Sequence, residues 1–312
     1  MQLVFSTNQL DDLSSGSVVT IGNFDGLHLG HQALVSKVTS LAEQHQLKSV
    51  ALTFQPFPRV YFEPQKPHIC LQRLSEKYLT LRSMDIDYLL CLRFNEALAQ
   101  LSPEEFVCSI LVDGLQAKFV VVGDDFRFAK NRMGNVETLR ALGLKYGFSV
   151  LQLTTQQIDG HRVSSTRVRA QLQAGDLQTV QQLLGRPFRL TARVVYGDQR
   201  GREWGFPTAN LPLFRELSPL TGIFAVKVSG EDFQANGVAS IGYRPVFKLN
   251  RPLLEVYILD FDRDIYGQRL SVEFLHKIRD EADFDSVEDL VARIQMDVSE
   301  AKAYFASQKS LN

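Results

Sequence analysis

Cysteine is scarce in this sequence of 312 residues: there are three, Cys70, Cys91 and Cys108, and no two of them are spaced as Cys-x-x-Cys. An odd number without paired spacing argues against a disulfide framework and against a cysteine-based zinc site. Since all three lie in apolar stretches, we expect buried free thiols in a reducing compartment.

An excess of charge of either sign is also missing. Lys and Arg number 34 and Asp and Glu number 35, so the composition predicts no nucleic-acid partner and no anionic membrane surface. Residues 1–13 have neither a basic start nor an apolar signal core, and no apolar run approaches the length of a membrane span. We therefore expect a soluble cytoplasmic protein with small-molecule partners. We also expect it to act as a monomer or a transient homo-oligomer.

The stretch with the most candidate functional residues runs from Thr20 to His31 and reads Thr-Ile-Gly-Asn-Phe-Asp-Gly-Leu-His-Leu-Gly-His. The apolar run over 18–21 predicts a buried strand, and Gly22 and Gly26 are typical of turns. From Leu27 onward the apolar residues follow helical periodicity. The pattern therefore predicts a strand that leads into a helix through a tight turn.

The two histidines of this stretch fall at the predicted helix start. Helix N-termini offer backbone N–H groups and the positive end of the dipole to phosphate. His28 and His31 are three residues apart, so both imidazoles share one helix face and can donate to one phosphoryl group. Gly30 between them lets a ligand approach the backbone closely. The alternative is one surface histidine and one core histidine.

The remainder of the first half alternates between strands and helices. Strands are predicted over 48–54, 87–94, 117–123 and 148–153. One intervening helix begins with a capping box, with Ser102 as the cap, Pro103 next and Glu105 three residues after the cap. This alternation predicts an open parallel sheet with helices on both faces and a ligand site at the carboxyl ends of the strands.

Two further segments offer groups suited to phosphate. Prolines stiffen the turn after the second predicted strand and would hold Arg59 near the ligand crevice, unless it is a solvated surface charge. Later, a predicted helix begins with hydroxyl side chains and carries two guanidinium groups. These residues are Ser164, Ser165, Thr166, Arg167 and Arg169. By itself this segment is also typical of an ordinary helix cap.

From Arg186 the pattern changes to successive strands. Residues 171–185 predict two short helices broken at Gly175-Asp176, and we place a domain boundary near Gly185. Strands follow over 190–196, 222–228, 234–241, 253–261 and 269–275, which favours an antiparallel barrel. A helix capped by Ser286 closes the chain over 286–305. No repeat or low-complexity linker separates the halves, so we expect two touching domains.

Two polar positions stand out in this second half. Thr208 and Asn210 project to the same side of an extended chain, where their oxygens suffice for Mg²⁺ if ATP phosphates supply the other ligands. Their segment also fits a simple hairpin loop. Glu255 is the sole carboxylate in an apolar strand, and burial would raise its pKa and suit a general base. The alternative is a strand residue that faces outward.

Two motifs resemble one known family. Residues 22–31 resemble the His-x-Gly-His signature of nucleotidyltransferases, in the form carried by bacterial bifunctional riboflavin kinase/FAD synthetases. Gly-Phe-Pro-Thr-Ala-Asn, over 205–210, is similar to the Pro-Thr-Ala-Asn motif of riboflavin kinases. The resemblance implies a Rossmann-like α/β nucleotidyltransferase domain with an open parallel sheet over 1–185. An antiparallel β-barrel riboflavin kinase domain with a C-terminal helix would then occupy 186–312.

The resemblance also implies substrates and residue roles. Riboflavin and ATP with Mg²⁺ would give FMN, and FMN with a second ATP would give FAD and pyrophosphate. In the first domain, ATP would contact Gly22, Asn23, Phe24, Gly26, His28, His31, Ser164, Ser165, Thr166 and Arg169. Arg59 and Asp125 would contact the nucleotide or the flavin, although Asp125 also fits an Asx-turn. In the second domain, Glu255 would be the base, Thr208 and Asn210 would hold ATP and the metal, and Arg279 would contact flavin.

Four residues depart from the family pattern. The family usually reads Thr-Phe-Glu-Pro-His-Pro-Arg and Asn-Ile-Gly-Thr-Arg, where this chain has Gln55 and Phe57, and Ser240 and Tyr243. One alternative is a nucleotidyltransferase for another phosphate, which would leave Pro207 to Asn210 without a purpose. A second is a flavin-binding regulatory or carrier protein that has lost catalysis, which the departures at Gln55 and Phe57 favour and the intact motif residues oppose.

Overall fold

The computed structural model describes residues 1–10, 12–197, 200–213, 217–246 and 249–309. Contacts divide the chain into two compact units. The first comprises Met1–Lys66 and Gln72–Ser164, and the second comprises Pro67–Leu71 and Ser165–Asn312.

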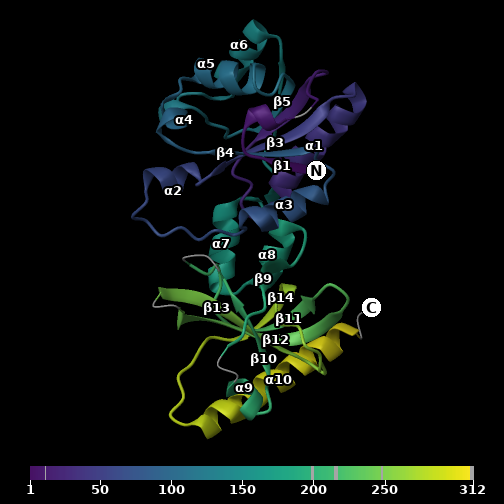
Figure 1. Ribbon diagram of the computed structural model, residues 1–312, viewed down its shortest axis with the longest axis vertical. Coiled ribbons are helices and arrows are strands. Elements are labelled where there is room, and N and C mark those ends of the chain that lie inside the picture. The colour runs from purple at the N-terminus through teal and green to yellow at the C-terminus, as the bar shows by residue number, and fades with distance from the viewer. Residues whose placement is uncertain (11, 198–199, 214–216, 247–248, 310–312) are drawn as a thin grey trace. The chain divides into compact units, whose positions relative to one another are not determined.

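A parallel sheet of six strands forms the centre of the first unit (Figure 1). Its strands are β1 (Gln2–Val4), β2 (Ser17–Ile21), β3 (Lys48–Gln55), β4 (Tyr88–Arg93), β5 (Ala117–Gly123) and β6 (Ser149–Leu153). The order β1-β4-β3-β2-β5-β6 confirms the predicted open parallel sheet. Since the strand order reverses between β2 and β5, their carboxyl ends flank a topological switch point, where such sheets bind ligands.

Helices cover both faces of this sheet (Figure 1). They are α1 (Leu29–His45), α2 (Pro58–Phe62), α3 (Leu74–Arg82), α4 (Glu96–Gln100), α5 (Pro103–Phe106), which continues into a π-helical stretch (Val107–Val112), and α6 (Val136–Tyr146), with short 3-10 turns at Thr7–Gln9 and Lys130–Arg132. Alternate residues of β2 enter opposite cores: Val18 packs with the α1 residue Val35, and Val19 packs with Phe106 of α5. A hairpin of β7 (Gln157–Ile158) and β8 (His161–Arg162) follows β6. The predicted capping box is confirmed, because Ser102 and Glu105 exchange hydrogen bonds at the start of α5.

The second unit is built on an antiparallel sheet. Its strands are β9 (Phe188–Arg193), β10 (Thr208–Pro212), β11 (Gly222–Ser229), β12 (Gln234–Val246), β13 (Leu249–Ile258) and β14 (Arg269–Arg279), in the order β10-β13-β12-β11-β14-β9. The chain leaving β9 returns to β10 through one bridge, in which Val195 N donates to Asn210 O at 2.9 Å. The sheet is therefore a half-barrel, as the predicted antiparallel architecture requires.

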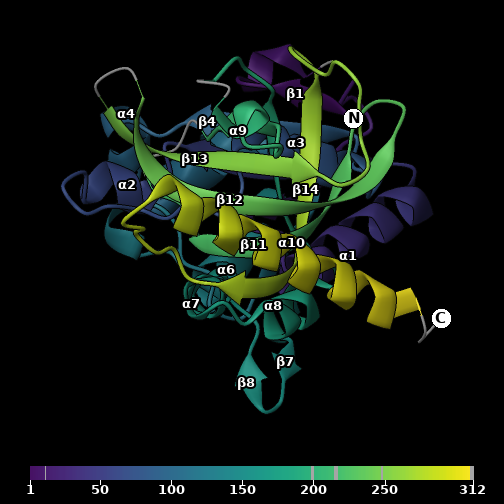
Figure 2. The same ribbon diagram turned by 90° about the horizontal axis from the view of Figure 1, so that it is seen from below.

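Among its described residues, the second unit has the helices α7 (Ser165–Ala174), α8 (Leu177–Leu184), α9 (Arg200–Glu203) and α10 (Val287–Lys309). Gly175, at φ +77°, separates α7 from α8 at the predicted break and packs against Lys277 of β14. Figure 2 shows α10 lying along the sheet, where Ala301 joins a core with Ile223 and Val238. Ser286 caps α10 as predicted, because its Oγ accepts from Asp289 N at 3.1 Å.

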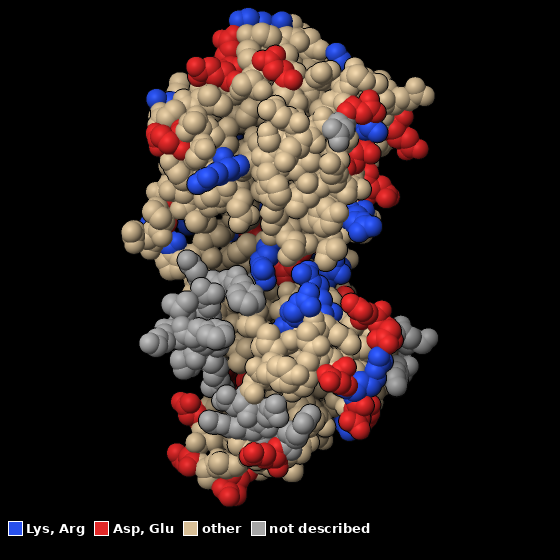
Figure 3. Space-filling view, viewed as in Figure 1, with Lys and Arg blue, Asp and Glu red and all other residues tan. Residues whose placement is uncertain are grey.

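The surface charge agrees with the balanced composition, whereas the cysteines agree with the prediction only in part. Both signs of charge are spread over the face shown in Figure 3. Over the part of the chain that the structure describes, none of the helices combines the length and the apolar character needed to cross a membrane. The three cysteines are free thiols, but only Cys91 is buried, whereas Cys70 and Cys108 are half-buried. Burial was therefore predicted correctly for one cysteine of three.

Candidate functional site

The turn after β2 lies at the topological switch point of the first unit. Its backbone is constrained: Phe24 and Leu27 have φ values of 47° and 45°, which are uncommon for residues other than glycine. The side chain of Phe24 is fully buried, whereas Asn23 is exposed. Any contact between Phe24 and ATP is therefore left to its backbone, and Asn23 offers its side chain as well.

His28 is the N-cap of α1 and not its first-turn residue, because the helix begins at Leu29. Its Nδ1 accepts a hydrogen bond from His31 N at 3.4 Å, so the imidazole uses one of the N–H groups that were expected to face a phosphate. The two rings stack with centroids 3.7 Å apart and an interplanar angle of 16°. The structure therefore brings the two histidines together as predicted, in a stack at the helix start.

Gly30 has a packing role that was not predicted. A Cβ at this position would lie 3.2 Å from Cε1 and 3.3 Å from Nδ1 of His28. The missing side chain thus makes room for the imidazole of His28. The predicted close approach of a ligand to the Gly30 backbone stays a prediction.

Both imidazoles are neutral at pH 7. Burial lowers the pKa of His28 from 6.5 to about 4, with nearby Arg162 adding to the fall and Asp25 opposing it. Burial also lowers the pKa of His31 well below 6.5, and His28, Lys77 and Arg162 contribute in the same direction. Desolvation penalises the charged form of each ring.

The hydrogen bonds indicate which nitrogen carries the proton. Nδ1 of His28 accepts a backbone hydrogen bond, so the proton of this neutral ring is on Nε2. Nδ1 of His31 is buried with no hydrogen-bond partner among the described residues, and an N–H in that position would be costly. We therefore assign the Nε2–H tautomer to both rings, which gives the site two neutral donors.

Asp125 follows β5 on the other side of the switch point. It forms an ion pair with Arg162 of β8, with Nη2 and Oδ2 2.5 Å apart, and both residues act electrostatically on His28. The structure thus brings Asp125 to the histidine site, together with Arg162, which the sequence reasoning missed. The only available signal was that Arg162 stands two residues before Ser164.

The other predicted residues of the first site lie on separate elements. Arg59 is on α2, and its exposed side chain contacts Glu63 at 3.4 Å. Ser164 ends the first unit, and Ser165 and Thr166 begin α7 in the second. Arg169 is half-buried and donates from Nε to Ile69 O at 2.6 Å. The residues of the predicted second phosphate clamp therefore belong to both units, and their role stays a prediction.

In the second unit, strand register places Glu255 directly opposite Asn210 of β10 on one side and Ser240 of β12 on the other. Directly paired residues of antiparallel strands share a face, so Thr208, two residues before Asn210, lies on this face as well. Glu255 is half-exposed between buried Leu254 and Val256. Glu255 is therefore only partly buried, where the sequence predicted burial, and the strand register places it beside Asn210.

Neighbouring residues pack closely against the polar face formed by Thr208, Asn210 and Glu255. A Cβ on Gly197 would lie 2.5 Å from Asn210 Nδ2, so the glycine backbone presses against the amide. The ring of Phe206, two residues before Thr208, contacts the Tyr257 ring edge-on, with the ring centroids 5.4 Å apart. Tyr243, one of the departures, accepts a hydrogen bond from Ser218 N at 3.0 Å. The described residues contain no group of three or more His, Cys, Asp or Glu side chains able to hold a metal.

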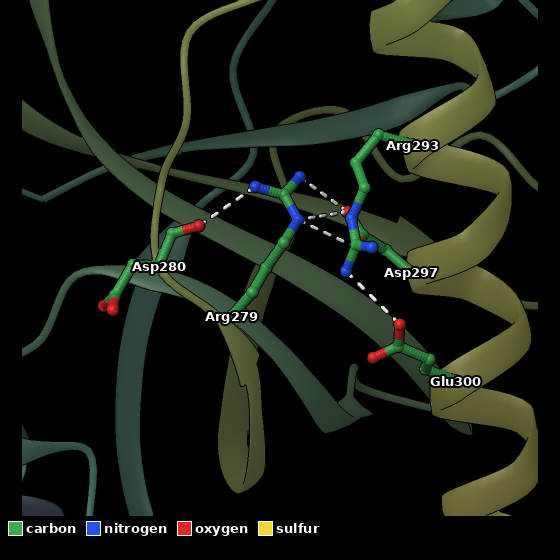
Figure 4. A network of polar contacts seen from close by, with 5 residues as sticks. All are labelled: Arg279, Asp280, Arg293, Asp297 and Glu300. Atoms are coloured by element: carbon green, nitrogen blue, oxygen red, sulfur yellow. Dashed lines mark hydrogen bonds and ion pairs between the residues drawn. The ribbon is translucent and has the colours of Figure 1, made fainter.

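Arg279, the predicted flavin contact, belongs to a buried ionic network at the end of β14 (Figure 4). Its Nε and Nη2 lie 2.9 and 2.7 Å from the Asp297 carboxylate, which is 3% exposed. Arg293 Nε lies 3.0 Å from the same carboxylate, and Arg293 Nη2 lies 3.2 Å from Glu300. Arg279 therefore ties β14 to α10, and its contact with flavin stays a prediction.

Known proteins match this chain in both halves. The FAD synthetase family model matches residues 10–167 and the riboflavin kinase family model matches residues 184–305. The bifunctional riboflavin kinase/FMN adenylyltransferase of Haemophilus influenzae is 41% identical, covering 98% of this chain and 100% of the relative. The protein of the same name from Pseudomonas fluorescens is 43% identical, with 98% of each chain covered. A crystal structure titled macrolide-efflux protein from Streptococcus pneumoniae has a TM-score of 0.84 at 30% identity, covering 96% of this chain and 98% of that one.

The fold and the histidine turn define a class: an α/β unit of the nucleotidyltransferase type, followed in the same chain by an antiparallel half-barrel unit. The two family models and the full-length relatives narrow this class to one family. The chain belongs to the bifunctional riboflavin kinase/FMN adenylyltransferase family.

Proposed function

We propose that this chain phosphorylates riboflavin to FMN with residues of its second unit and transfers AMP from ATP to FMN with residues of its first. The observation that carries the proposal is the separation of two sets of groups. Two stacked neutral imidazoles lie in the first unit, and a Thr-Asn-Glu face lies in the second. Each set suits one of the two reactions.

In the kinase reaction, Glu255 takes the proton of the ribityl 5′-hydroxyl as its oxygen attacks the γ-phosphorus of ATP and ADP leaves. A half-exposed carboxylate can reach an incoming substrate, and Asn210 lies directly opposite it. Thr208 and Asn210 would hold Mg²⁺ through their side-chain oxygens together with the ATP phosphates, and the positive charge of the ion would lower the barrier to attack. Arg279 contacts the flavin from the end of β14.

In the adenylyl transfer, a phosphate oxygen of FMN attacks the α-phosphorus of ATP, and the bond to pyrophosphate breaks. No protein base is needed, because a phosphate monoester has a second pKa of about 6. His28 and His31 donate from Nε2 to phosphate oxygens, and Gly22, Asn23, Phe24 and Gly26 shape the turn around them. Ser164, Ser165, Thr166 and Arg169 bind the phosphates, while Arg59 and Asp125 contact nucleotide or flavin.

The proposal extends to organisation in the cell. The adenylyltransferase domain covers 1–185 and the kinase domain 186–312, although contacts group α7 and α8 with the second unit and the family models leave residues 168–183 unmatched. The protein acts in the cytoplasm as a monomer or transient homo-oligomer. Its partners are riboflavin, FMN and ATP, with no nucleic acid or membrane.

One incubation tests the function. Purified protein with riboflavin, ATP and Mg²⁺ is sampled over time and separated by reversed-phase chromatography. FMN should appear first and FAD later, and omission of Mg²⁺ should abolish both. Unchanged riboflavin would overturn the proposal, and FMN without any FAD, even when FMN is supplied directly, would overturn its second half.

A further inference from the structure

A buried lysine lies beneath the signature turn of the first unit. Lys77, on α3, is 2% exposed, and its Nζ donates to Asn23 O at 2.5 Å and to Thr53 Oγ1 at 3.2 Å. Its Nζ also lies 4.8 Å from the centre of the Phe57 ring. Burying an ammonium group is costly, so a lysine at this position calls for an explanation.

A second contact holds the turn from the segment just before α3. Gln72 N donates to the Asp25 carboxylate at 3.0 Å, and Asp25 is itself only 2% exposed. The two contacts hold residues two positions apart in the turn. Phe24, which lies between them, has a left-handed φ of 47° and must be held by its surroundings.

The position of this turn decides where the imidazoles lie. The fully buried ring of Phe24 contacts the His31 ring edge-on, with centroids 5.4 Å apart, and His31 stacks on His28. The contacts therefore run from Lys77 through the Asn23 carbonyl and the Phe24 ring to both histidines. A shift at Asn23 would move the donors that the adenylyl transfer uses.

Phe57 completes the arrangement. An aromatic face over an ammonium group attracts it and shields it from water. The ring of Phe57 therefore covers the ammonium group of Lys77.

We propose that Lys77 is a positioning residue for adenylyl transfer, which holds the Asn23 carbonyl and thereby fixes the turn that carries His28 and His31. The inference rests on the proposed function of the first unit. After burial, the charges of His28, Lys77 and Arg162 also lower the pKa of His31, whereas Asp25 and Asp125 act to raise the pKa of His28. Lys77 therefore has both a geometric and an electrostatic effect on the site.

The test compares Lys77→Met and Lys77→Arg with Lys66→Met, an exposed lysine of the same unit that pairs with Glu63. FAD formation from FMN and ATP is measured over ATP concentration and pH, and riboflavin phosphorylation is measured in parallel. We expect Lys77→Met to lower kcat for FAD at least tenfold while FMN formation stays within twofold. Lys77→Arg should recover part of the loss, and Lys66→Met should match the wild type.

The pH profile separates positioning from a general loss of folding. Removing the Lys77 cation raises the pKa of His31. The acidic limb of the pH profile of FAD formation should therefore move to higher pH in Lys77→Met and stay in place in Lys77→Arg. If Lys77→Met unfolds, Lys77→Arg provides the test, because its hydrogen-bond donors are displaced while its charge is kept. A lowered kcat for FAD formation with an unmoved acidic limb of the pH profile then supports the proposal. Wild-type kcat in either Lys77 variant would overturn it. A wild-type protein that makes no FAD would instead overturn the proposed function.

Discussion

His28 combines two properties at the scale of a single residue: it caps α1 and it is a buried base. Its pKa in the folded protein, about 4, lies below the ordinary 6.5, so the unfolded chain takes up the proton first as the pH falls. The stability associated with the neutral ring is complete above pH 6.5 and is lost between pH 6.5 and about 4. At about 1.4 kcal/mol for each pKa unit, the full loss is about 3 kcal/mol.

Urea unfolding at pH 7.5 and pH 5 measures this loss. We expect the wild type to lose about 2 kcal/mol from His28 between the two pH values. His28→Asn keeps a good N-cap and removes the base, so its loss should be smaller by that amount. His161→Asn, at an exposed histidine of β8, serves as the control. An equal pH dependence in His28→Asn and the wild type would contradict the assignment.

Residue spacing was enough to predict the pairing of His28 and His31, but not their surroundings. Lys77 lies 54 residues from its acceptor Asn23 in sequence, so no local pattern could predict the contact. Arg162 reaches Asp125 only because the hairpin after β6 returns to the switch point. Such charges are set by tertiary structure, and they add to burial, which is the main reason that both imidazoles are neutral.

At the scale of elements, the ionic network joins β14 to α10 through one carboxylate. Asp297→Asn would leave the guanidinium groups of Arg279 and Arg293, 17% and 25% exposed, sharing a neutral partner. Breaking a buried pair on one side is expected to cost about 3 kcal/mol. Thermal and urea unfolding of the second unit should show this loss.

Asp280→Asn is the matched control, since Asp280 is 83% exposed and its carboxylate pairs with Lys277. It should cost less than about 1 kcal/mol, as exposed pairs do. Equal effects of the two substitutions would show that the network contributes no more than a surface pair. Retained stability in both would mean that packing alone holds α10.

Most elements could be predicted from the sequence because their apolar runs are bounded by strong breakers. The predicted strand over 117–123 matches β5, where the run ends at Gly123. β1 was missed, since its three residues are too short to show a period and depend on pairing with β4. β10 was predicted only as an extended chain, because its strand character comes from pairing with β13.

At the scale of the whole molecule, two separate sets of groups predict two separable activities. His28→Ala, with His31 intact, should lower FAD formation about 10²–10³-fold, the usual cost of one donor to a developing charge, while FMN still forms from riboflavin. Glu255→Gln should lower FMN formation about 10²–10⁴-fold through loss of the base, while supplied FMN is still converted to FAD. Each variant should therefore accumulate a different compound: FMN in the first and riboflavin in the second.

The controls keep each unit intact. His45 is exposed and lies at the opposite end of α1, so His45→Ala is the control for His28→Ala. Glu273 lies on β14, a strand that does not pair with β13, so Glu273→Gln is the control for Glu255→Gln. Both should retain both activities within twofold. Chromatography of reactions started from riboflavin and, separately, from FMN distinguishes the two steps. A site variant that lost both activities, although circular dichroism showed a folded chain, would contradict the proposal. A substitution confined to one unit would then have abolished the reaction assigned to the other, so the two reactions would share one site.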